Sequence, residues 1–179
     1  MRWILADVLT LIQYVLLVEH GISLDRGARC PHCGKSGLWL HGNYGRKADR
    51  SDQGDGSLNP ILIQRFFCRS CKRTCSALPE CIPPRRWYLW EVQQMALSLY
   101  LSGKSAYAIA KEIVPSRHTI SRWIARFKEQ LRLHKDALCH HVIELGRSQD
   151  FAEFWQACFN SFSLGKAMRL CHVAGVVIP

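Results

Sequence analysis

Cys30-Pro31-His32-Cys33 and Cys68-Arg69-Ser70-Cys71 are two Cys-x-x-Cys pairs, and they decide the fold of this chain. A tetrahedral zinc ion takes four soft ligands, and two thiolates one short turn apart fill two of its corners without strain. The pairs therefore predict one zinc ion bound by Cys30, Cys33, Cys68 and Cys71. Two disulfides, or thiols packed as small apolar side chains, are the alternatives. His32 and His41 could compete as ligands, but we expect four sulfurs, with His32 turned outward.

The segment between the two pairs has the composition of a β-hairpin. Residues 37–44 and 61–67 are rich in β-branched and aromatic side chains, which is typical of strands. Residues 45–60 are polar, charged and glycine-rich, which indicates a flexible loop at the hairpin tip. We therefore predict a zinc ribbon over residues 28–75, followed by a stiff, proline-rich linker over residues 76–86.

The net charge of +10 is concentrated in one part of the chain. Residues 68–135 hold 13 Lys and Arg against four Asp and Glu, whereas the remaining residues hold 11 against ten. A charge that served solubility alone would be spread more evenly. The excess predicts an anionic partner, although charge by itself does not separate a nucleic acid from a membrane surface.

Residues 87–134 predict a helix-turn-helix domain of three helices. The first helix begins at Trp87 and ends at Gly103. Ser105 and Ser116 are the expected N-caps of two further helices, over residues 106–113 and 117–133, with a break at Val114-Pro115. The side chains expected to face the core are those of Ile109, Ile113, Ile120, Trp123 and Ile124.

The opposite face of the last of these helices is the candidate DNA-contact surface. Short polar and Arg side chains at the start of such a helix can reach base edges in the major groove. For base contacts we expect Arg117, His118, Ser121 and Arg122, and Ser116 lies on the same DNA-contact surface. For phosphate contacts we expect Arg85, Arg86, Lys104, Arg126 and Lys128. The alternative is an ordinary helical hairpin with a solvated basic face, since Val114 stands where this motif often has glycine.

The two ends of the chain complete the predicted fold. Residues 1–22 are very apolar and predict a mostly buried helix ending at Gly21, with membrane association as the alternative. Residues 135–179 predict a helical region whose aromatic stretch forms core or dimer surface. The fold class is therefore mainly α, with a small β zinc ribbon, a helix-turn-helix unit and flanking N- and C-terminal helices.

Five of the nine cysteines lie outside the two pairs: Cys75, Cys81, Cys139, Cys158 and Cys171. They stand mostly among apolar neighbours, which fits a reducing interior better than a disulfide framework, so we expect a cytoplasmic protein. Cys75 and Cys81 are near enough to the second pair to exchange with its ligands, but we expect both to be buried.

The order of these features resembles a known family. Cys30-Pro31-His32-Cys33-Gly34 is followed by His41-Gly42-x-Tyr44-x-Arg46, by Arg65-x-x-Cys68-x-x-Cys71-x-Arg73-Thr74 and by Leu78-Pro79. Over residues 28–130 this looks like the amino-terminal part of bacterial insertion-sequence transposases and of their short accessory DNA-binding proteins. The resemblance implies that the ribbon and the helix-turn-helix bind the terminal repeats of a mobile element. That family usually has an aromatic residue where Cys75 stands.

A transposase of that type also carries three carboxylates on a ribonuclease-H-like sheet, and the residues after Gln130 show no alternating strand–helix pattern to hold them. We therefore expect a non-catalytic, sequence-specific DNA-binding protein of a mobile element, either an accessory factor or a repressor. Its expected partners are double-stranded DNA, a second copy of the chain and a transposase or other subunit, with no small-molecule substrate. The alternatives are a nuclease or recombinase using Glu144 or His140-His141, and a membrane-tethered adaptor that docks proteins through the ribbon.

Overall fold

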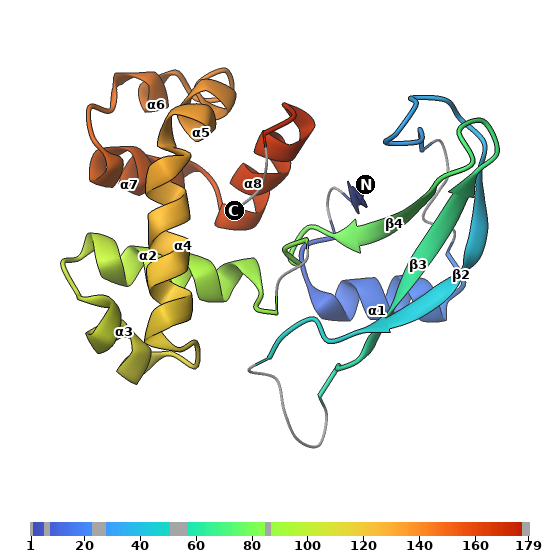
Figure 1. The fold of residues 1–179 in the computed structure, drawn as a ribbon, viewed down its shortest axis with the longest axis horizontal. Helices are drawn as coiled ribbons and strands as arrows, with labels where there is room; N and C mark the ends of the chain where they lie inside the picture. The colour runs from blue at the N-terminus through green and yellow to red at the C-terminus, as the bar shows by residue number, and fades with distance from the viewer. Residues whose placement is uncertain (1, 6–7, 23–27, 51–56, 85–86, 177–179) are drawn as a thin grey trace. The chain divides into compact units, whose positions relative to one another are not determined.

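The chain forms two compact units, Met1–Leu89 and Trp90–Pro179, in a computed structural model that describes residues 2–5, 8–22, 28–50, 57–84 and 87–176. The described residues form eight helices and one four-stranded sheet (Figure 1). The sheet lies in the first unit, which we call unit 1, and seven of the helices lie in the second, which we call unit 2. The protein is thus mainly α with a small β part.

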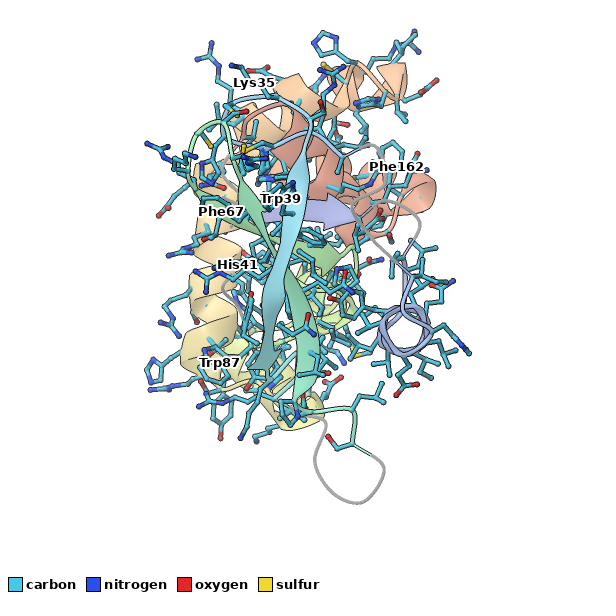
Figure 2. The ribbon with its side chains drawn as sticks, turned by 90° about the vertical axis from the view of Figure 1, so that its right-hand side faces the viewer. Lys35, Trp39, His41, Phe67, Trp87 and Phe162 are labelled. Carbon is cyan, nitrogen blue, oxygen red and sulfur yellow. The ribbon has the colours of Figure 1, made fainter. Side chains whose placement is uncertain are left out.

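Unit 1 is a sheet with one helix across it. The strands are β1 (Arg2–Leu5), β2 (Leu38–Arg46), β3 (Ile61–Cys68) and β4 (Thr74–Pro79), in the order β1-β4-β3-β2. β1 pairs with β4 in parallel, and the other pairs are antiparallel. Helix α1 (Leu11–Glu19) packs on one face of the sheet (Figure 1). The opposite face presents Trp39, His41 and Phe67 (Figure 2).

Tyr14 joins α1 to the sheet. Its side chain is fully buried, and its hydroxyl donates to the carbonyl of Ala77 at 3.4 Å and accepts from the N–H of Gln64 at 3.2 Å. Burial raises the pKa of Tyr14. The ring therefore supplies apolar area to the core, while its hydroxyl satisfies two backbone groups that would otherwise lose hydrogen bonds on burial.

The N-terminal segment differs from the single helix expected over residues 1–22. Arg2–Leu5 form strand β1, and the helix begins only at Leu11. Thr10 explains the start: its hydroxyl accepts the N–H of Gln13 at 3.1 Å, and the Gln13 side chain accepts the N–H of Thr10 at 3.2 Å. This reciprocal pair is a capping box, a signal present in the sequence. Gly21 follows the helix with φ +64°, as expected of a residue that ends one.

The segment over residues 76–86 also differs from the stiff linker expected there. Ser76 to Pro79 belong to β4, which pairs on both sides, and Leu78, Cys81 and Ile82 are buried in the core of unit 1. The physical reason is the gain from burying these apolar side chains against the sheet, which outweighs the turn-forming tendency of the prolines. Arg85 and Arg86 lie outside the described residues.

The hairpin tip is held at its base. The amide of Asn59 accepts the N–H of Ala48 at 2.7 Å and donates to the carbonyl of Asp49 at 2.6 Å. Ala48 and Asp49 are both buried. The flexible loop predicted over residues 45–60 is therefore anchored on both flanks, and residues 51–56 lie outside the described part.

The regular structure in the described part of unit 2 consists of helices. They are α2 (Trp90–Leu101), α3 (Ala106–Glu112), α4 (Arg117–Glu129), α5 (Leu131–Leu138), α6 (Ile143–Arg147), α7 (Phe151–Ser161) and α8 (Leu164–Val173). Trp155 lies at the centre of the core, with the rings of Phe127 and Phe154 edge-on to it at 5.0 and 5.1 Å. Such edge-to-face pairs add to the stability that burial provides.

The helix boundaries follow the capping residues. Ser105 and Ser116 are N-caps, as the sequence predicts, and each accepts the N–H three residues on. The last predicted helix, over residues 117–133, is instead two helices, because Gln130 leaves the helical backbone between α4 and α5. The first predicted helix begins at Trp90 rather than Trp87.

Replacement of the α8 cap, Ser163→Ala, is expected to lower the free energy of unfolding of unit 2 by about 1 kcal/mol. The Ser163 hydroxyl accepts the N–H of Lys166 at 3.2 Å, and α8 buries Met168 and Cys171. Chemical denaturation measures the change. Ser161→Ala is the control, because that exposed side chain ends α7 and caps no helix N-terminus. Equal losses in the two variants would contradict the capping role.

His134 is a buried titratable side chain of unit 2. It is fully buried, its ring lies 5.8 Å from that of Phe127 and 5.4 Å from that of Trp155, and neither ring nitrogen has a hydrogen-bond partner among the described residues. Burial lowers the pKa of His134 to about 4. The ordinary value in an unfolded chain is about 6.5.

We expect unit 2 to lose stability as the pH falls from about 6.5 to about 4, because the unfolded chain takes up a proton that the folded unit excludes. Above this pH window the neutral His134 side chain makes its full contribution to the free energy of unfolding. Below the window that free energy is lower by about 3 kcal/mol, at about 1.4 kcal/mol per pKa unit. Thermal unfolding across the window measures it. His134→Leu should flatten the profile, and the exposed His118→Leu should not. A His134→Leu variant with the original profile would refute this origin.

Candidate metal centre and basic helix

The two Cys-x-x-Cys pairs form turns with the same backbone hydrogen bonds. In the first, Cys30 donates to the carbonyl of Lys35 at 2.8 Å and Gly34 donates to that of Cys30 at 2.8 Å. In the second, Cys68 donates to Arg73 and Lys72 donates to Cys68, both at 2.9 Å. Gly34 and Lys72 both have positive φ, +71° and +58°. This left-handed step turns the chain so that both cysteines of a pair point to one side.

The four sulfurs converge on one point. All four lie within 4.8 Å of one another, and two of the separations, Cys30 to Cys71 and Cys33 to Cys68, are 3.7 Å. A tetrahedral ion with metal–sulfur bonds of about 2.3 Å holds its sulfurs about 3.8 Å apart. A disulfide needs about 2.05 Å, so the four cysteines are free thiols. The cluster therefore has the geometry to hold one metal ion.

The electrostatics of the cluster are compatible with a bound cation. The backbone N–H of Cys71 lowers the pKa of Cys68 to about 6. Burial, in contrast, raises the pKa of Cys71 to about 11. The cluster thus favours a first thiolate and resists further negative charge, because several thiolates in one pocket repel each other away from water. A metal ion between the sulfurs removes that conflict.

The side chains that could compete as ligands lie outside the cluster. The His32 Nε2 is 3.3 Å from the carbonyl oxygen of Thr74, and the His41 ring lies 5.8 Å from the ring of Phe67. Cys75 and Cys81 are buried in the core of unit 1, and burial raises the pKa of Cys75. Among the residues that the structure describes, the four cysteines are the one group of His, Cys, Asp or Glu side chains placed to hold an ion.

Helix α4 has a buried side and an exposed side, as its sequence predicts. Ile120, Trp123, Ile124 and Phe127 are buried, and α3 packs on the helix through the buried Ile109. We call the exposed stripe the α4 face, and it consists of Ser116, Arg117, His118, Ser121, Arg122 and Ala125. Within the described part of the chain, the side chains of Arg117, Arg122 and Arg126 are exposed and make no hydrogen bond or ion pair. Ile113, expected in the core, is only partly buried.

Two of the lysines expected to contact phosphate are engaged within the protein. The ammonium of Lys104 lies 2.7 Å from both carboxylate oxygens of Glu112. Lys128 donates to the Tyr100 hydroxyl at 2.7 Å and lies over the rings of Tyr100 and Phe151. The Lys104–Glu112 pair spans α3, whose two ends it joins, whereas the Lys128–Tyr100 contact depends on how α4 packs on α2, and sequence reasoning missed both. These lysines are therefore less available to a ligand than Arg117, Arg122 and Arg126.

The acids and histidines of the C-terminal region serve the helices. Asp150 caps α7 by accepting the N–H of Glu153 at 2.9 Å, and Glu153 accepts the N–H of Gln149 at 2.8 Å. Glu144 lies in the first turn of α6, and the adjacent His140 and His141 are exposed in the turn before it. These acidic and histidine side chains are dispersed, and each either accepts a hydrogen bond at the start of a helix or faces solvent.

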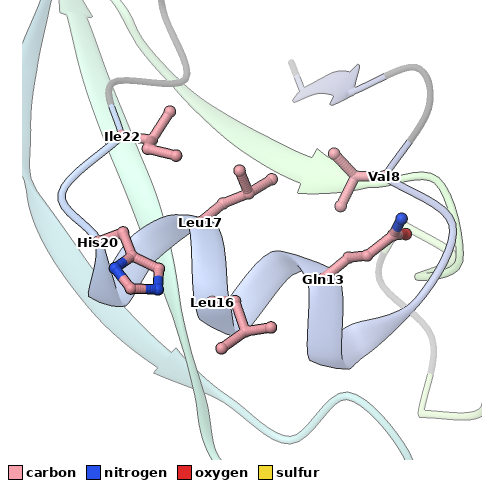
Figure 3. Close-up of a pocket in the computed structure, with 6 residues that line it drawn as sticks. All are labelled: Val8, Gln13, Leu16, Leu17, His20 and Ile22. Carbon is pink, nitrogen blue, oxygen red and sulfur yellow. The ribbon is translucent and has the colours of Figure 1, made fainter.

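A pocket of about 390 Å³ lies beside α1 (Figure 3). Its lining is mostly apolar, with Gln13 and His20 as the polar side chains. It lacks the convergent polar groups that orient a small ligand. Helix α1 has nine residues, and no helix in the described part of the chain has the length and hydropathy needed to cross a membrane.

The comparisons with known proteins find a family model that matches the chain. Residues 30–123 fit the model of a family described as "Domain of unknown function (DUF6431)". The matched segment begins at the first cysteine of the cluster, takes in β2, β3, β4, α2 and α3, and ends at Trp123 in α4. No curated protein and no solved structure matches the chain. Since the match covers more than half of the sequence, the chain belongs to the DUF6431 family.

Proposed function

We propose that this chain is a zinc-containing, sequence-specific binding protein for double-stranded DNA, without catalytic activity. The observation that carries the proposal is the α4 face, where Ser116, Arg117, His118, Ser121 and Arg122 are all exposed on one side of a helix buried on the other. Arg117 and Arg122 have no partner within the described residues, so both guanidinium groups are free to bind a ligand.

The side chains of the α4 face suit a duplex groove. Positions 117, 118, 121, 122 and 125 recur at helical spacing, so they point the same way. Arginine binds guanine O6 and N7 through two parallel hydrogen bonds, and serine accepts or donates to several base edges. In this proposal α3, residues 113–116 and α4 act as a helix-turn-helix, with α4 in the major groove and Arg126 on the phosphate backbone.

Zinc is the ion that this donor set favours. Closed tetrahedral sites made of four thiolates are typical of structural zinc, and a site with four protein ligands leaves no position for a substrate. Bound there, zinc would join residues 30–33 to residues 68–71 and so fix the open end of the β2–β3 hairpin. The cysteines would thus stabilise unit 1 rather than take part in a reaction.

The biological setting rests on the sequence resemblance over residues 28–130. It points to a mobile element, with the protein acting as a transposition accessory factor or a repressor. A second copy of the chain is the expected partner, because duplex sites of such helices are commonly read as paired half-sites. A transposase or another subunit is the other expected protein partner.

Selection from a random duplex library tests the proposal. The purified full chain, loaded with zinc, should enrich one short motif, and its affinity for that motif should fall steeply with salt because Lys and Arg displace counterions from phosphate. Supercoiled plasmid incubated with the protein and Mg²⁺ should stay intact. Binding to random duplex as tight as binding to every selected sequence would refute the proposal, and nicking would favour a nuclease.

A further inference from the structure

We propose a second nucleic-acid site on unit 1, one that binds unpaired nucleotides by stacking their bases on the exposed face of the sheet. We call this surface the aromatic face, and it consists of Trp39, His41, Arg65, Phe67 and Arg69. The inference goes beyond duplex binding by α4, since it concerns a different unit and a different form of nucleic acid.

The strand register places the aromatic face on one side of the sheet. Trp39 of β2 pairs with Phe67 of β3, and Phe67 pairs with Thr74 of β4, so the three share one row. Arg65 stands two residues from Phe67, and alternate residues of a strand point to the same side. The register of β2 is irregular between Leu40 and Asn43, and His41 is placed on this side by its ring, which lies 5.8 Å from that of Phe67. The neighbours Phe66 and Cys68 point to the other side and are buried. Figure 2 shows Trp39, His41 and Phe67 close together along β2 and β3.

The rings of Trp39 and His41 are exposed, that of Phe67 is half-buried, and all three are held by neighbouring side chains. Trp39 is 55% exposed, which is unusual for a residue of its size on the sheet of a small unit. The guanidinium carbon of Arg69 lies 4.4 Å from the centre of the Trp39 ring, and the His41 and Phe67 rings lie 5.8 Å apart. Arg65 donates to the hydroxyl of Thr74 at 3.2 Å. Aromatic rings and guanidinium planes are thus presented side by side before any ligand binds.

The charge around the aromatic face has a single sign. Over residues 28–50 and 57–84, the acidic side chains are Asp49 and Glu80, and both are buried. The exposed cations of the same part are Arg29, Lys35, Lys47, Arg50, Arg65, Arg69, Lys72 and Arg73. This positively charged surface therefore attracts a polyanion. The exposed rings favour a polyanion that also carries aromatic groups.

Unpaired nucleotides satisfy both features at once. Each nucleotide carries a phosphate for the arginines and a planar base that stacks on Trp, Phe, His or a guanidinium plane. In a duplex the bases already stack on each other and offer only their edges, so a flat platform of rings gains little from it. An acidic protein segment would match the charge but would leave the rings exposed.

Fluorescence titration of the zinc-loaded full chain with a short oligodeoxythymidylate, an oligouridylate and a duplex tests the inference. Trp39→Ala and Phe67→Ala should each weaken binding of the single strands by roughly 10- to 100-fold, the range expected for one stacked base. Binding of the duplex should be unchanged. Trp39→Tyr should retain most of the affinity, because the ring is kept. A preference for one of the two oligonucleotides would identify the sugar that the site accepts.

Trp87→Ala is the matched control. Trp87 is also in unit 1, is 53% exposed and has a guanidinium, that of Arg50, 5.0 Å from its ring centre, but it lies away from Trp39 and Phe67 (Figure 2). It should leave single-strand binding unchanged. Retained zinc and an unchanged circular dichroism spectrum identify the variants that are folded, and Phe67→Leu replaces any variant that is not.

The outcomes separate this inference from the function proposed for α4. Loss of single-strand binding in Trp39→Ala with intact duplex binding supports the inference, and Arg117→Ala with Arg122→Ala should show the reverse pattern. Failure of the original protein to bind either oligonucleotide, or folded Trp39→Ala and Phe67→Leu variants that bind as the original does, would overturn it. Equal, Trp39-dependent binding of polyglutamate would also overturn it, in favour of an acidic protein partner.

Discussion

Cys68→Ser is expected to release the metal ion and unfold unit 1. Structural zinc contributes about 10–16 kcal/mol of apparent binding free energy in small domains, whereas a whole domain is stable by only about 5–15 kcal/mol. Cys68 ends β3 and is buried beside the core residue Phe66, so its loss removes a ligand and opens the sheet at the same place. Metal content by mass spectrometry should fall from one ion per chain to none.

Cys75→Ser is the matched control for this prediction. Cys75 is a buried cysteine of the neighbouring strand β4 and lies outside the four-sulfur cluster. Cys75→Ser should lower the free energy of unfolding by about 1–3 kcal/mol, because it buries a hydroxyl without a hydrogen-bond partner. It should leave one ion bound. A chelator should lower the unfolding temperature of unit 1 in the original protein and in Cys75→Ser alike. Retention of the ion by Cys68→Ser, or its loss from Cys75→Ser, would show that the ligand set is different.

The cysteine cluster could be predicted from the sequence, because each of its two pairs is specified by a short run of neighbouring residues. Each pair forms a turn with its own backbone hydrogen bonds, and the positive φ of Gly34 needs only the residue type at that position. The strands on either side of the tip were predictable for the same reason, since β-branched and aromatic residues are concentrated in them. Lys72 has the matching conformation without glycine, so the sequence alone did not show that the two turns are alike.

The pairing of β1 with β4 was beyond sequence reasoning. Arg2–Leu5 and Ser76–Pro79 are more than 70 residues apart, and a parallel pair leaves no turn signal between its strands. The apolar start of the chain therefore looked continuous with α1, although Thr10 and Gln13 mark where the helix begins. The burial of Cys81 and Ile82 depends on the same sheet, which is why residues 76–86 looked like a linker.

The exposed side of α4 could be predicted from the 3.6-residue period of its apolar residues. The partners of the charged side chains near it could not be predicted. The period separates Ile120, Trp123 and Ile124 from Arg117, Ser121 and Arg122, because burial follows the helix face. The Lys104–Glu112 ion pair depends on the path of the chain before α3, and the Lys128–Tyr100 contact depends on the packing of α4 on α2. Sequence reasoning therefore located the α4 face correctly but overstated the number of free cations near it.

The double variant Arg117→Ala with Arg122→Ala is expected to lose about 2–6 kcal/mol of binding free energy on the selected duplex, the sum of two base contacts. Both side chains are exposed and have no partner within the described residues, so the unfolding temperature should not change. A loss of affinity without a loss of stability separates recognition from folding. The discrimination between selected and random duplex should fall with it, because these two residues are expected to contact bases.

A control with the same change of charge decides whether α4 reads sequence or only attracts phosphate. Lys111→Ala with Arg132→Ala removes two exposed cations from α3 and α5 of the same unit, so the net charge of both double variants is equal. If the α4 face reads bases, this control should bind selected and random duplexes slightly more weakly by the same factor, with specificity intact. If both double variants lose affinity equally and keep their specificity, α4 is merely one part of a diffuse basic surface and the proposed recognition is wrong.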